Sequence, residues 1–265
     1  MKGFVFVLAF LFTLGTFGQG EDLLNSLKGK KVIYVWGGWP GHKPKESVDF
    51  FVPWLKSEGA IVTVSNSLDI YTDKEIMSQV DLIIQNWSMG KINKEQFQGL
   101  LDAVIDGAGF AGWHGGMADA FRDNLEYQFL VGGIFLSHPG GFVDFEVNIV
   151  DSQDPITYGI KDFSLKQTEQ YYMLVDPNVK VLATTTFDQE SYPLYEWRDN
   201  KMIESKDKKL TWITGNKIPV VWKKNYGKGR IFYSSIGHFL SDFDVPEAFE
   251  IQKRGIRWAA NGKQN

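Results

Sequence analysis

The sequence predicts an α/β fold with a mostly parallel central sheet and an antiparallel extension. Over residues 30–112, short apolar segments alternate with amphipathic segments, which is the pattern of parallel strands joined by crossover helices. After residue 140, apolar and polar residues alternate over residues 143–149, which is typical of a strand with one solvated face. No linker or low-complexity tract interrupts the chain, so we expect a single domain over residues 19–265.

The first half of the chain follows a β-α-β-α-β-α-β order. Strands are expected at residues 31–36, 61–64, 81–86 and 109–112. A helix is expected at residues 44–58, where Pro53 can introduce a kink. Thr72 and Glu75 form a capping box that predicts the start of a short helix. Asn93 and Gln96 predict the cap of a third helix, which closes at Gly107.

The second half is expected to be richer in strands. They are predicted at residues 143–149, 179–185, 193–197, 219–222 and 230–235. Residues 226–229 predict a hairpin turn between the last two of these strands. Charged residues dominate positions 198–210, which we interpret as a solvated loop. A closing helix is expected from Pro246 to Ala260.

The N-terminus has the pattern of a secretory signal peptide over residues 1–18. Lys2 precedes an uninterrupted apolar run at residues 4–12, and small residues precede Gln19. The run is too short to span a bilayer of about 30 Å as a helix; the alternative is a buried N-terminal strand. No later segment is hydrophobic enough to cross a membrane. We therefore expect an exported protein, periplasmic or secreted, with no membrane partner.

The composition excludes several classes of function. The chain has 28 Lys and Arg against 32 Asp and Glu, a net charge of −4. This leaves no basic stripe for a phosphate backbone, so nucleic acid is not an expected partner. The chain also has no cysteine, which excludes disulfides, thiolate metal ligands and thiolate nucleophiles. Nothing in the sequence indicates the oligomeric state.

The segment that says most about chemistry is Gly112-Trp-His-Gly-Gly. Glycines surround His114 in the pattern of a nucleophile elbow, which is a strained turn between a strand and a helix. The turn follows an expected strand at its carboxyl end, where open α/β sheets bind ligands. We therefore interpret His114 as functional, with a loop histidine of no role as the alternative.

The other three histidines, His42, His138 and His238, also lie in expected loops beside glycine or proline. Imidazoles that converge at strand ends could hold a divalent ion such as Zn²⁺, with His114, His138 and His238 as candidate ligands. Alternatively, a pair of histidines could act as acid and base near neutral pH. No His-x-x-x-His spacing supports the metal directly, so both roles stay open.

Aromatic residues gather in the same loops and indicate a surface for sugar. Flat aromatic faces can stack on sugar rings, and flanking polar side chains can bind hydroxyl groups. The candidate binding residues are Trp36, Trp39, His42, Asn86, Trp113, Asp119 and Tyr171. The alternative for the rings is that they fill the core, which is the usual place of large aromatic side chains.

Together these residues resemble the ThuA-like family of trehalose-utilisation proteins. The shared stretches begin at Gly37, Gly112, Gly132, Asp154, Glu169, Pro219 and Gly255. The resemblance keeps its order over residues 30–261. Asp154 departs from it, since a histidine is common at that position, and residues 198–210 resemble a local insertion.

The resemblance implies a flavodoxin-like three-layer sandwich related to class I glutamine amidotransferases. It places His114 where those enzymes carry their thiol, and His238 at a position similar to their catalytic histidine. Because the chain lacks cysteine, thiolate attack on a glutamine amide is excluded. The family is associated with trehalose and related disaccharides, alongside oxidoreductases that form 3-keto sugars. A small-molecule sugar and a sugar oxidoreductase are therefore the implied partners.

The leading hypothesis is an exported hydrolase or lyase that acts on a glucoside, a disaccharide or its 3-keto derivative. In this hypothesis His114 and His238 are acid and base or metal ligands, and Glu169 orients or ionises one imidazole. A 3-keto sugar carries an acidic proton beside its carbonyl, so cleavage by elimination needs one base and one carbonyl-polarising group. The alternative is a non-catalytic carbohydrate-binding module that uses the same cleft.

Overall fold

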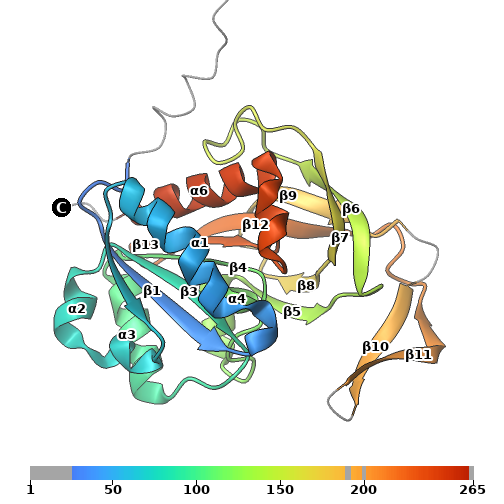
Figure 1. Cartoon of the computed structure of the whole chain (residues 1–265), viewed down its shortest axis with the longest axis horizontal. Helices are drawn as coiled ribbons and strands as arrows, with labels where there is room; N and C mark the ends of the chain where they lie inside the picture. Colours follow the sequence, from blue (N-terminus) through green and yellow to red (C-terminus); the bar gives the residue numbers. More distant parts are fainter. Residues whose placement is uncertain (1–25, 189–191, 199–200, 263–265) are drawn as a thin grey trace, which may run out of the picture.

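A nine-stranded sheet forms the centre of the molecule (Figure 1). The computed structural model describes residues 26–188, 192–198 and 201–262. The strand order is β2-β1-β3-β4-β13-β12-β9-β6-β7. Five neighbouring strands are parallel, namely β2 (Ile61–Ser65), β1 (Lys31–Gly38), β3 (Leu82–Ser88), β4 (Gly109–Trp113) and β13 (Gly229–Ser234). Four strands run antiparallel to their neighbours, namely β12 (Lys217–Tyr226), β9 (Lys180–Thr186), β6 (Phe142–Ile149) and β7 (Phe163–Glu169).

Helices cover both faces of this sheet and complete three layers. One face carries α1 (Pro44–Ser57) and α6 (Pro246–Ala260), and the other carries α2 (Lys74–Gln79), α3 (Lys94–Ile105), α4 (Gly115–Ala118) and α5 (Leu125–Val131). Side chains of β1 alternate between the layers: Val32 and Tyr34 pack with α1 and α6, whereas Ile33 and Val35 pack with α2 and α3. The predicted α/β sandwich with a parallel centre and an antiparallel extension is confirmed.

Two small sheets lie outside the nine-stranded one. β5 (Gly133–Ser137) pairs with β8 (Tyr172–Val175), and β10 (Tyr192–Arg198) pairs with β11 (Lys201–Leu210) in a hairpin at the right of Figure 1. The interpretation of residues 198–210 as a solvated loop is wrong, because Lys201–Leu210 forms a strand. In the described part of the chain β10 and β11 pair only with each other. A hairpin outside the layers needs no continuous apolar face, so its charged composition concealed the strand. β5, β7 and β8 were also not predicted.

The ends of the predicted helices show one correction. The short helix α2 is capped by Asp73, whose side chain accepts a hydrogen bond from the Ile76 amide at 3.0 Å. Thr72 instead ends the 3-10 helix Leu68–Thr72 and donates to the Asp69 carbonyl. The other short 3-10 helices are Pro40–His42 and Leu240–Asp244. The capping box at the start of α3, the hairpin turn after β12 and the closing helix α6 are confirmed.

Two expectations concern membranes and export. The predicted signal peptide over residues 1–18 lies outside the described residues. Within the described part, no helix combines the length and the hydropathy needed to cross a bilayer.

Candidate functional site

Four loops that follow parallel strands meet at the carboxyl edge of the sheet. His42 follows β1, Ser88 ends β3, His114 follows β4, and His238 follows β13. The imidazole centroids of His42 and His114 are 4.9 Å apart, and those of His114 and His238 are 5.1 Å apart. The predicted convergence of these histidines is therefore confirmed, as expected where parallel strands end together.

The elbow fixes the position of His114 through an unusual backbone conformation. His114 has φ 48° and ψ −145°, which an L residue rarely adopts and which strains the backbone. Its amide donates to the Ser234 carbonyl at 2.7 Å, and the Tyr233 hydroxyl donates to its carbonyl at 3.1 Å. Glycine at the next position allows the close approach of the His42 ring, because a Cβ at Gly115 would lie 2.3 Å from that ring.

Glu169 reaches the same place from the antiparallel part of the sheet. Gln167 in β7 has φ 48°, and its amide donates to the Asp144 carboxylate at 2.9 Å. The pairing of β6 and β7 shifts register beside this point, which is the mark of a β-bulge. The bulge shifts the alternation of side chains along β7, so that Thr168 faces Asp242 and the next residue, Glu169, faces His114.

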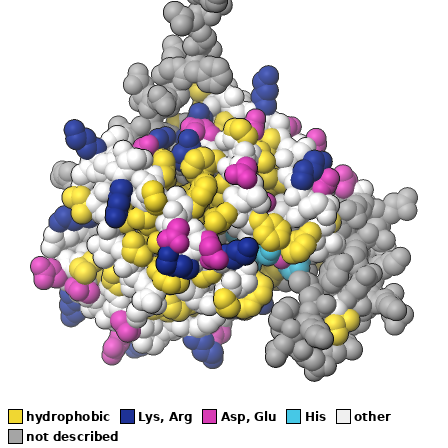
Figure 2. Space-filling view, viewed as in Figure 1, with side chains coloured by type: hydrophobic (Ala, Val, Ile, Leu, Met, Phe, Trp, Pro, Cys, Tyr) yellow, Lys and Arg dark blue, Asp and Glu magenta, His cyan; other side chains and the backbone are white. Residues whose placement is uncertain are grey.

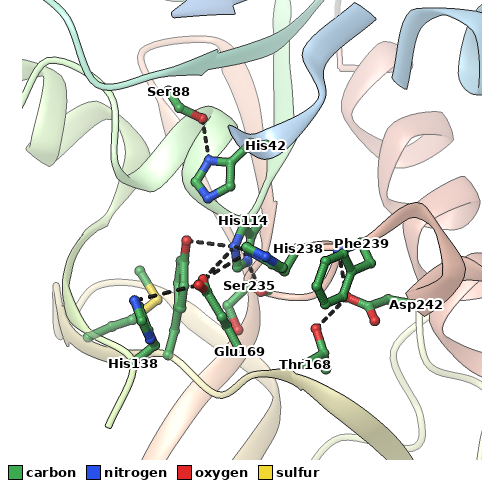
Figure 3. Close-up of polar contacts among 12 residues, drawn as sticks. His42, Ser88, His114, His138, Thr168, Glu169, Ser235, His238, Phe239 and Asp242 are labelled. Atoms are coloured by element: carbon green, nitrogen blue, oxygen red, sulfur yellow. Dashed lines mark hydrogen bonds and ion pairs between the residues drawn. The ribbon is translucent and has the colours of Figure 1, made fainter. Parts of the chain in front are cut away.

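Three ligand-type atoms form a nearly equilateral triangle (Figure 3). His114 Nε2 lies 3.1 Å from Glu169 Oε2 and 3.2 Å from His238 Nδ1, and these last two atoms are 3.1 Å apart. His42 adds a fourth nitrogen, and the four atoms all lie within 4.8 Å of one another. We call His42, His114, Glu169 and His238 the His/Glu cluster. This cluster could hold a metal ion.

Hydrogen bonds on the far side of two rings direct their free nitrogens into the cluster. His114 Nδ1 donates to the Ser235 carbonyl at 2.9 Å, and a carbonyl can only accept, so the neutral ring carries no proton on Nε2. His42 Nδ1 lies 2.6 Å from the Ser88 hydroxyl, which accepts in the tautomer that leaves Nε2 free. An imidazole that donates its other N–H to a carbonyl or a polar side chain is the usual arrangement of a metal ligand.

Burial and mutual charge tune the protonation of the cluster. Burial lowers the pKa of His42 to about 2, and the neighbouring His114 adds to this effect. Burial alone would raise the pKa of Glu169, but its contacts with His114 and His238, which become hydrogen bonds to the carboxylate when those rings carry the proton, outweigh burial and hold the pKa well below its usual value. The cluster therefore offers a neutral His42 and an ionised Glu169, which are the forms that bind metal.

His138 lies at the edge of the cluster, not in it. Its Nε2 is 3.5 Å from Glu169 Oε1, the oxygen that faces away from His114 and His238. Burial lowers the pKa of His138, and the charge of Glu169 opposes this shift. The ligand set thus differs from the predicted set of His114, His138 and His238, because the structure brings in Glu169 and His42 and leaves His138 outside.

Of the residues expected to bind sugar, His42 belongs to the cluster, and Tyr171 and Trp39 touch it. The Tyr171 hydroxyl lies 2.7 Å from His114 Nε2, and its ring stacks on that imidazole with a centroid distance of 4.0 Å. The Trp39 ring meets the His42 ring edge-on at 4.7 Å. Figure 2 shows histidine side chains at the surface of this face, bordered by hydrophobic side chains.

The other expected binding residues lie in or under the core. Trp113 is 2% exposed and packs on Phe51 at 4.3 Å, and Trp36 packs against the same cluster of α1 and α6. Trp113 is a core residue, because it projects from the sheet into the helical layer, whereas Trp36 is half-buried at the edge of that layer. Asn86 is buried beside Gly116 of the elbow, and Asp119 is buried in an ion pair with Arg122.

Sequence reasoning missed the residues that hold the cluster in place. Ser88 orients His42, and Asp242 accepts from the Thr168 hydroxyl at 2.9 Å and from the Phe239 amide at 3.2 Å, which ties the loop after His238 to β7. Phe142 was also missed; its ring lies 5.2 Å from the His238 ring. A signal existed for Ser88, which is the polar residue at the end of a buried strand. None existed for Asp242, whose partner is far away in sequence.

The chain matches one known protein family and is similar to several solved structures. The profile of the family described as ThuA, trehalose utilisation, matches residues 31–259. No curated protein matches the chain. Among solved structures, a putative ThuA-like protein from Bacteroides uniformis has 16% sequence identity and a TM-score of 0.67, covering 89% of this chain and 92% of that chain.

Two further solved structures are similar. A putative ThuA-like protein from Parabacteroides merdae has 18% identity and a TM-score of 0.65, covering 90% of this chain and 93% of that one. A cytoplasmic protein from Salmonella typhimurium has 12% identity and a TM-score of 0.55, covering 88% of this chain and 98% of that one. At these identities the likeness shows the fold alone.

Proposed function

The chain belongs to the ThuA family, whose description is trehalose utilisation, and from this premise we propose that it is an exported enzyme of carbohydrate breakdown. Its substrate is a glucoside, a disaccharide or the 3-keto derivative of one. Its reaction centre is the His/Glu cluster, which binds a divalent transition metal such as Zn²⁺. A sugar oxidoreductase that forms the 3-keto group is its functional partner.

The observation that supports a bound metal is the convergence of ligand-type atoms on one point. His114 Nε2 faces Glu169 Oε2 and His238 Nδ1 at 3.1 and 3.2 Å, although the Ser235 carbonyl retains the only proton of the neutral His114 ring. Lone pairs that meet in a buried site repel unless a proton or a cation lies between them. With ligand distances of about 2.1 Å, neighbouring ligands of a metal lie about 3.0 to 3.4 Å apart. The triangle of 3.1–3.2 Å fits this range.

The bound metal would supply a Lewis acid that polarises the sugar carbonyl. His138 is suited to be the base, because burial lowers its pKa and keeps it neutral at pH 7. It takes the proton from the carbon beside the carbonyl, and that electron pair forms a C=C bond as the glycosidic C–O bond breaks. His138 then returns the proton to the departing oxygen. Burial raises the pKa of Tyr171, so its hydroxyl keeps a proton to donate to a substrate oxygen.

The test measures metal content and turnover on the same samples. Purified protein is dialysed against Zn²⁺ and analysed by mass spectrometry for bound metal, then incubated with 3-keto methyl glucoside while methanol release is followed. We expect one metal per chain and turnover that a chelator abolishes. His114→Ala should lose both, whereas Gln252→Ala, which removes a buried polar side chain from α6 on the other side of the sheet, should keep both.

The second candidate function is a carbohydrate-binding module. Exposed or half-buried aromatic rings beside the cluster favour it, since they suit sugar binding without any reaction. In that case His114→Ala would bind sugar as the wild type does, and neither protein would release product. Turnover by the wild-type protein would rule this candidate out.

A further inference from the structure

Two aromatic rings beside the cluster are not accounted for by packing in the core. Phe142 is 47% exposed, although water contact with a large apolar ring is unfavourable. Its centroid lies 5.2 Å from the His238 ring and 5.2 Å from the Phe239 ring. Phe239 in turn meets the His238 ring edge-on at 4.3 Å. The two phenyl rings thus form one apolar surface against a residue of the His/Glu cluster.

The backbone holds Phe142 on the same side as the cluster. Phe142 pairs with Glu169 across β6 and β7, and paired residues of antiparallel strands project from the same face of a sheet. Gly140 and Gly141, with φ 90° and 70°, turn the chain after His138 so that β6 starts at Phe142. The ring is therefore placed by sheet register, and its exposure does not come from a loop.

A third aromatic ring, that of Trp39, lies beside His42 of the cluster. Trp39 lies 4.7 Å from His42, and the His42 and His238 rings are 5.4 Å apart. Trp39, His42, His238 and Phe142 thus form a row in which the two ligand-type imidazoles lie between two aromatic side chains. Aromatic faces bind the apolar C–H face of a pyranose, whose hydroxyl edge can then reach polar groups beside it.

We propose that Phe142 and Phe239 form a stacking platform for a pyranose ring, which places the oxygens of that ring at the His/Glu cluster. The proposal rests on the proposed carbohydrate function and narrows its substrate class to closed-ring pyranosides. An open-chain polyol also carries hydroxyl groups but has no flat C–H face, so it gains nothing from the platform. Phe142 is then a specificity-determining residue, distinct from the residues that hold metal.

The test compares sugar affinity in three variants of the full mature chain with added Zn²⁺. Titration calorimetry with methyl α-glucoside, trehalose and glucitol is run on the wild type, Phe142→Ala, Phe142→Trp and Phe129→Ala. Phe129 is the matched control, because it is 64% exposed on α5. Bound Zn²⁺ and the circular dichroism spectrum of each variant show whether the cluster and the fold are intact.

We expect Phe142→Ala to weaken binding of both glucosides roughly tenfold, which is about 1.4 kcal/mol, with unchanged Zn²⁺ content. Phe142→Trp and Phe129→Ala should bind like the wild type, and glucitol should bind weakly to all. Equal affinity of Phe142→Ala and the wild type for the glucosides overturns the platform alone. Absence of glucoside binding by a wild type that releases methanol from 3-keto methyl glucoside also overturns the platform alone. Absence of both glucoside binding and methanol release overturns the carbohydrate function together with the platform.

Discussion

Substituting Glu169 with glutamine separates the metal hypothesis from a purely protonic role of the cluster. Glutamine has nearly the same shape, and its amide can donate to His114 Nε2 or His238 Nδ1, which lie 3.1 Å from Glu169 Oε2. The metal-free variant should therefore fold. A neutral amide is a much poorer ligand than a carboxylate, so the variant should lose metal affinity.

The magnitude can be worked out in steps. Loss of a group that merely supports a ligand costs about 10- to 100-fold in metal affinity, so loss of the charged ligand itself should cost at least about 100-fold. At a metal concentration 100 times the Kd, the wild type gains about 2.7 kcal/mol of stability, and the variant gains about 0.4 kcal/mol at the same concentration. For a chain of this size, these values correspond to a rise in Tm of about 5–10 °C in the wild type and about 1 °C in Glu169→Gln.

The assay is a thermal melt with and without Zn²⁺, together with metal analysis of the dialysed protein. Asp154→Asn is the matched control, because Asp154 is also a buried carboxylate, paired with Lys223 Nζ at 2.6 Å and Lys180 Nζ at 2.8 Å. It should lower the Tm of the metal-free protein and leave the Zn²⁺-induced rise intact. Glu169→Gln with one bound metal and a wild-type rise in Tm would refute the reasoning.

Three further predictions follow from the contacts and the sequence. Ser88→Ala removes the acceptor of His42 Nδ1 and should weaken metal binding about 10- to 100-fold, whereas the exposed Ser57→Ala should not; equal binding of the two by calorimetry would contradict the role of Ser88. The metal-free protein should lose stability as the pH falls below 6.5, by at most about 1.4 kcal/mol per pH unit from His42. The reason is that His42 binds a proton in the unfolded chain but not in the folded one, where its pKa is lowered to about 2. Urea melts that coincide at pH 7 and pH 5 would argue against this. Mass spectrometry of protein from its native host should find an N-terminus near Gln19, and a chain that keeps Met1 would overturn the expected export.

The parts of the fold that could be predicted from the sequence are those in which local pattern and packing agree. The strands and helices of the parallel half carry apolar residues because both faces of that sheet are covered, so each element shows its period directly. α6 was predicted with the bounds that the structure gives it. The hairpin of β10 and β11 lies outside the layers, and its charged strand therefore carried no pattern that distinguishes it from a loop.

The candidate site also contains residues that could be predicted from the sequence and residues that could not. His42, His114 and His238 could be placed because each follows a recognisable strand beside glycine, and the topology of a parallel sheet brings such positions to one edge. The direction of a side chain is not fixed by this topology. Trp113 and His114 are neighbours at the end of β4, yet their side chains point in different directions. Trp113 packs in the core against Phe51, whereas the turn at His114 directs the imidazole of His114 into the site. The sequence placed His138 among the metal ligands, where the structure has Glu169 instead. The position of Glu169 depends on a bulge at Gln167, and the sequence around Gln167 has no pattern that predicts a bulge.

The strained turn at His114 explains how one backbone conformation can support different chemistry, depending on the side chain that it carries. A left-handed conformation at a non-glycine residue costs about 1–3 kcal/mol, and here it is held by hydrogen bonds from Tyr233, to Ser234 and to Ser235, all on or directly after β13. The strain aims whatever side chain stands at this position over the carboxyl edge of the sheet. A thiol there would be a nucleophile, but an imidazole whose Nδ1–H is bound by the Ser235 carbonyl presents only the lone pair of Nε2. That lone pair lies 3.1 Å from Glu169 Oε2 and 3.2 Å from His238 Nδ1, so this position could hold a cation or a proton between the three side chains.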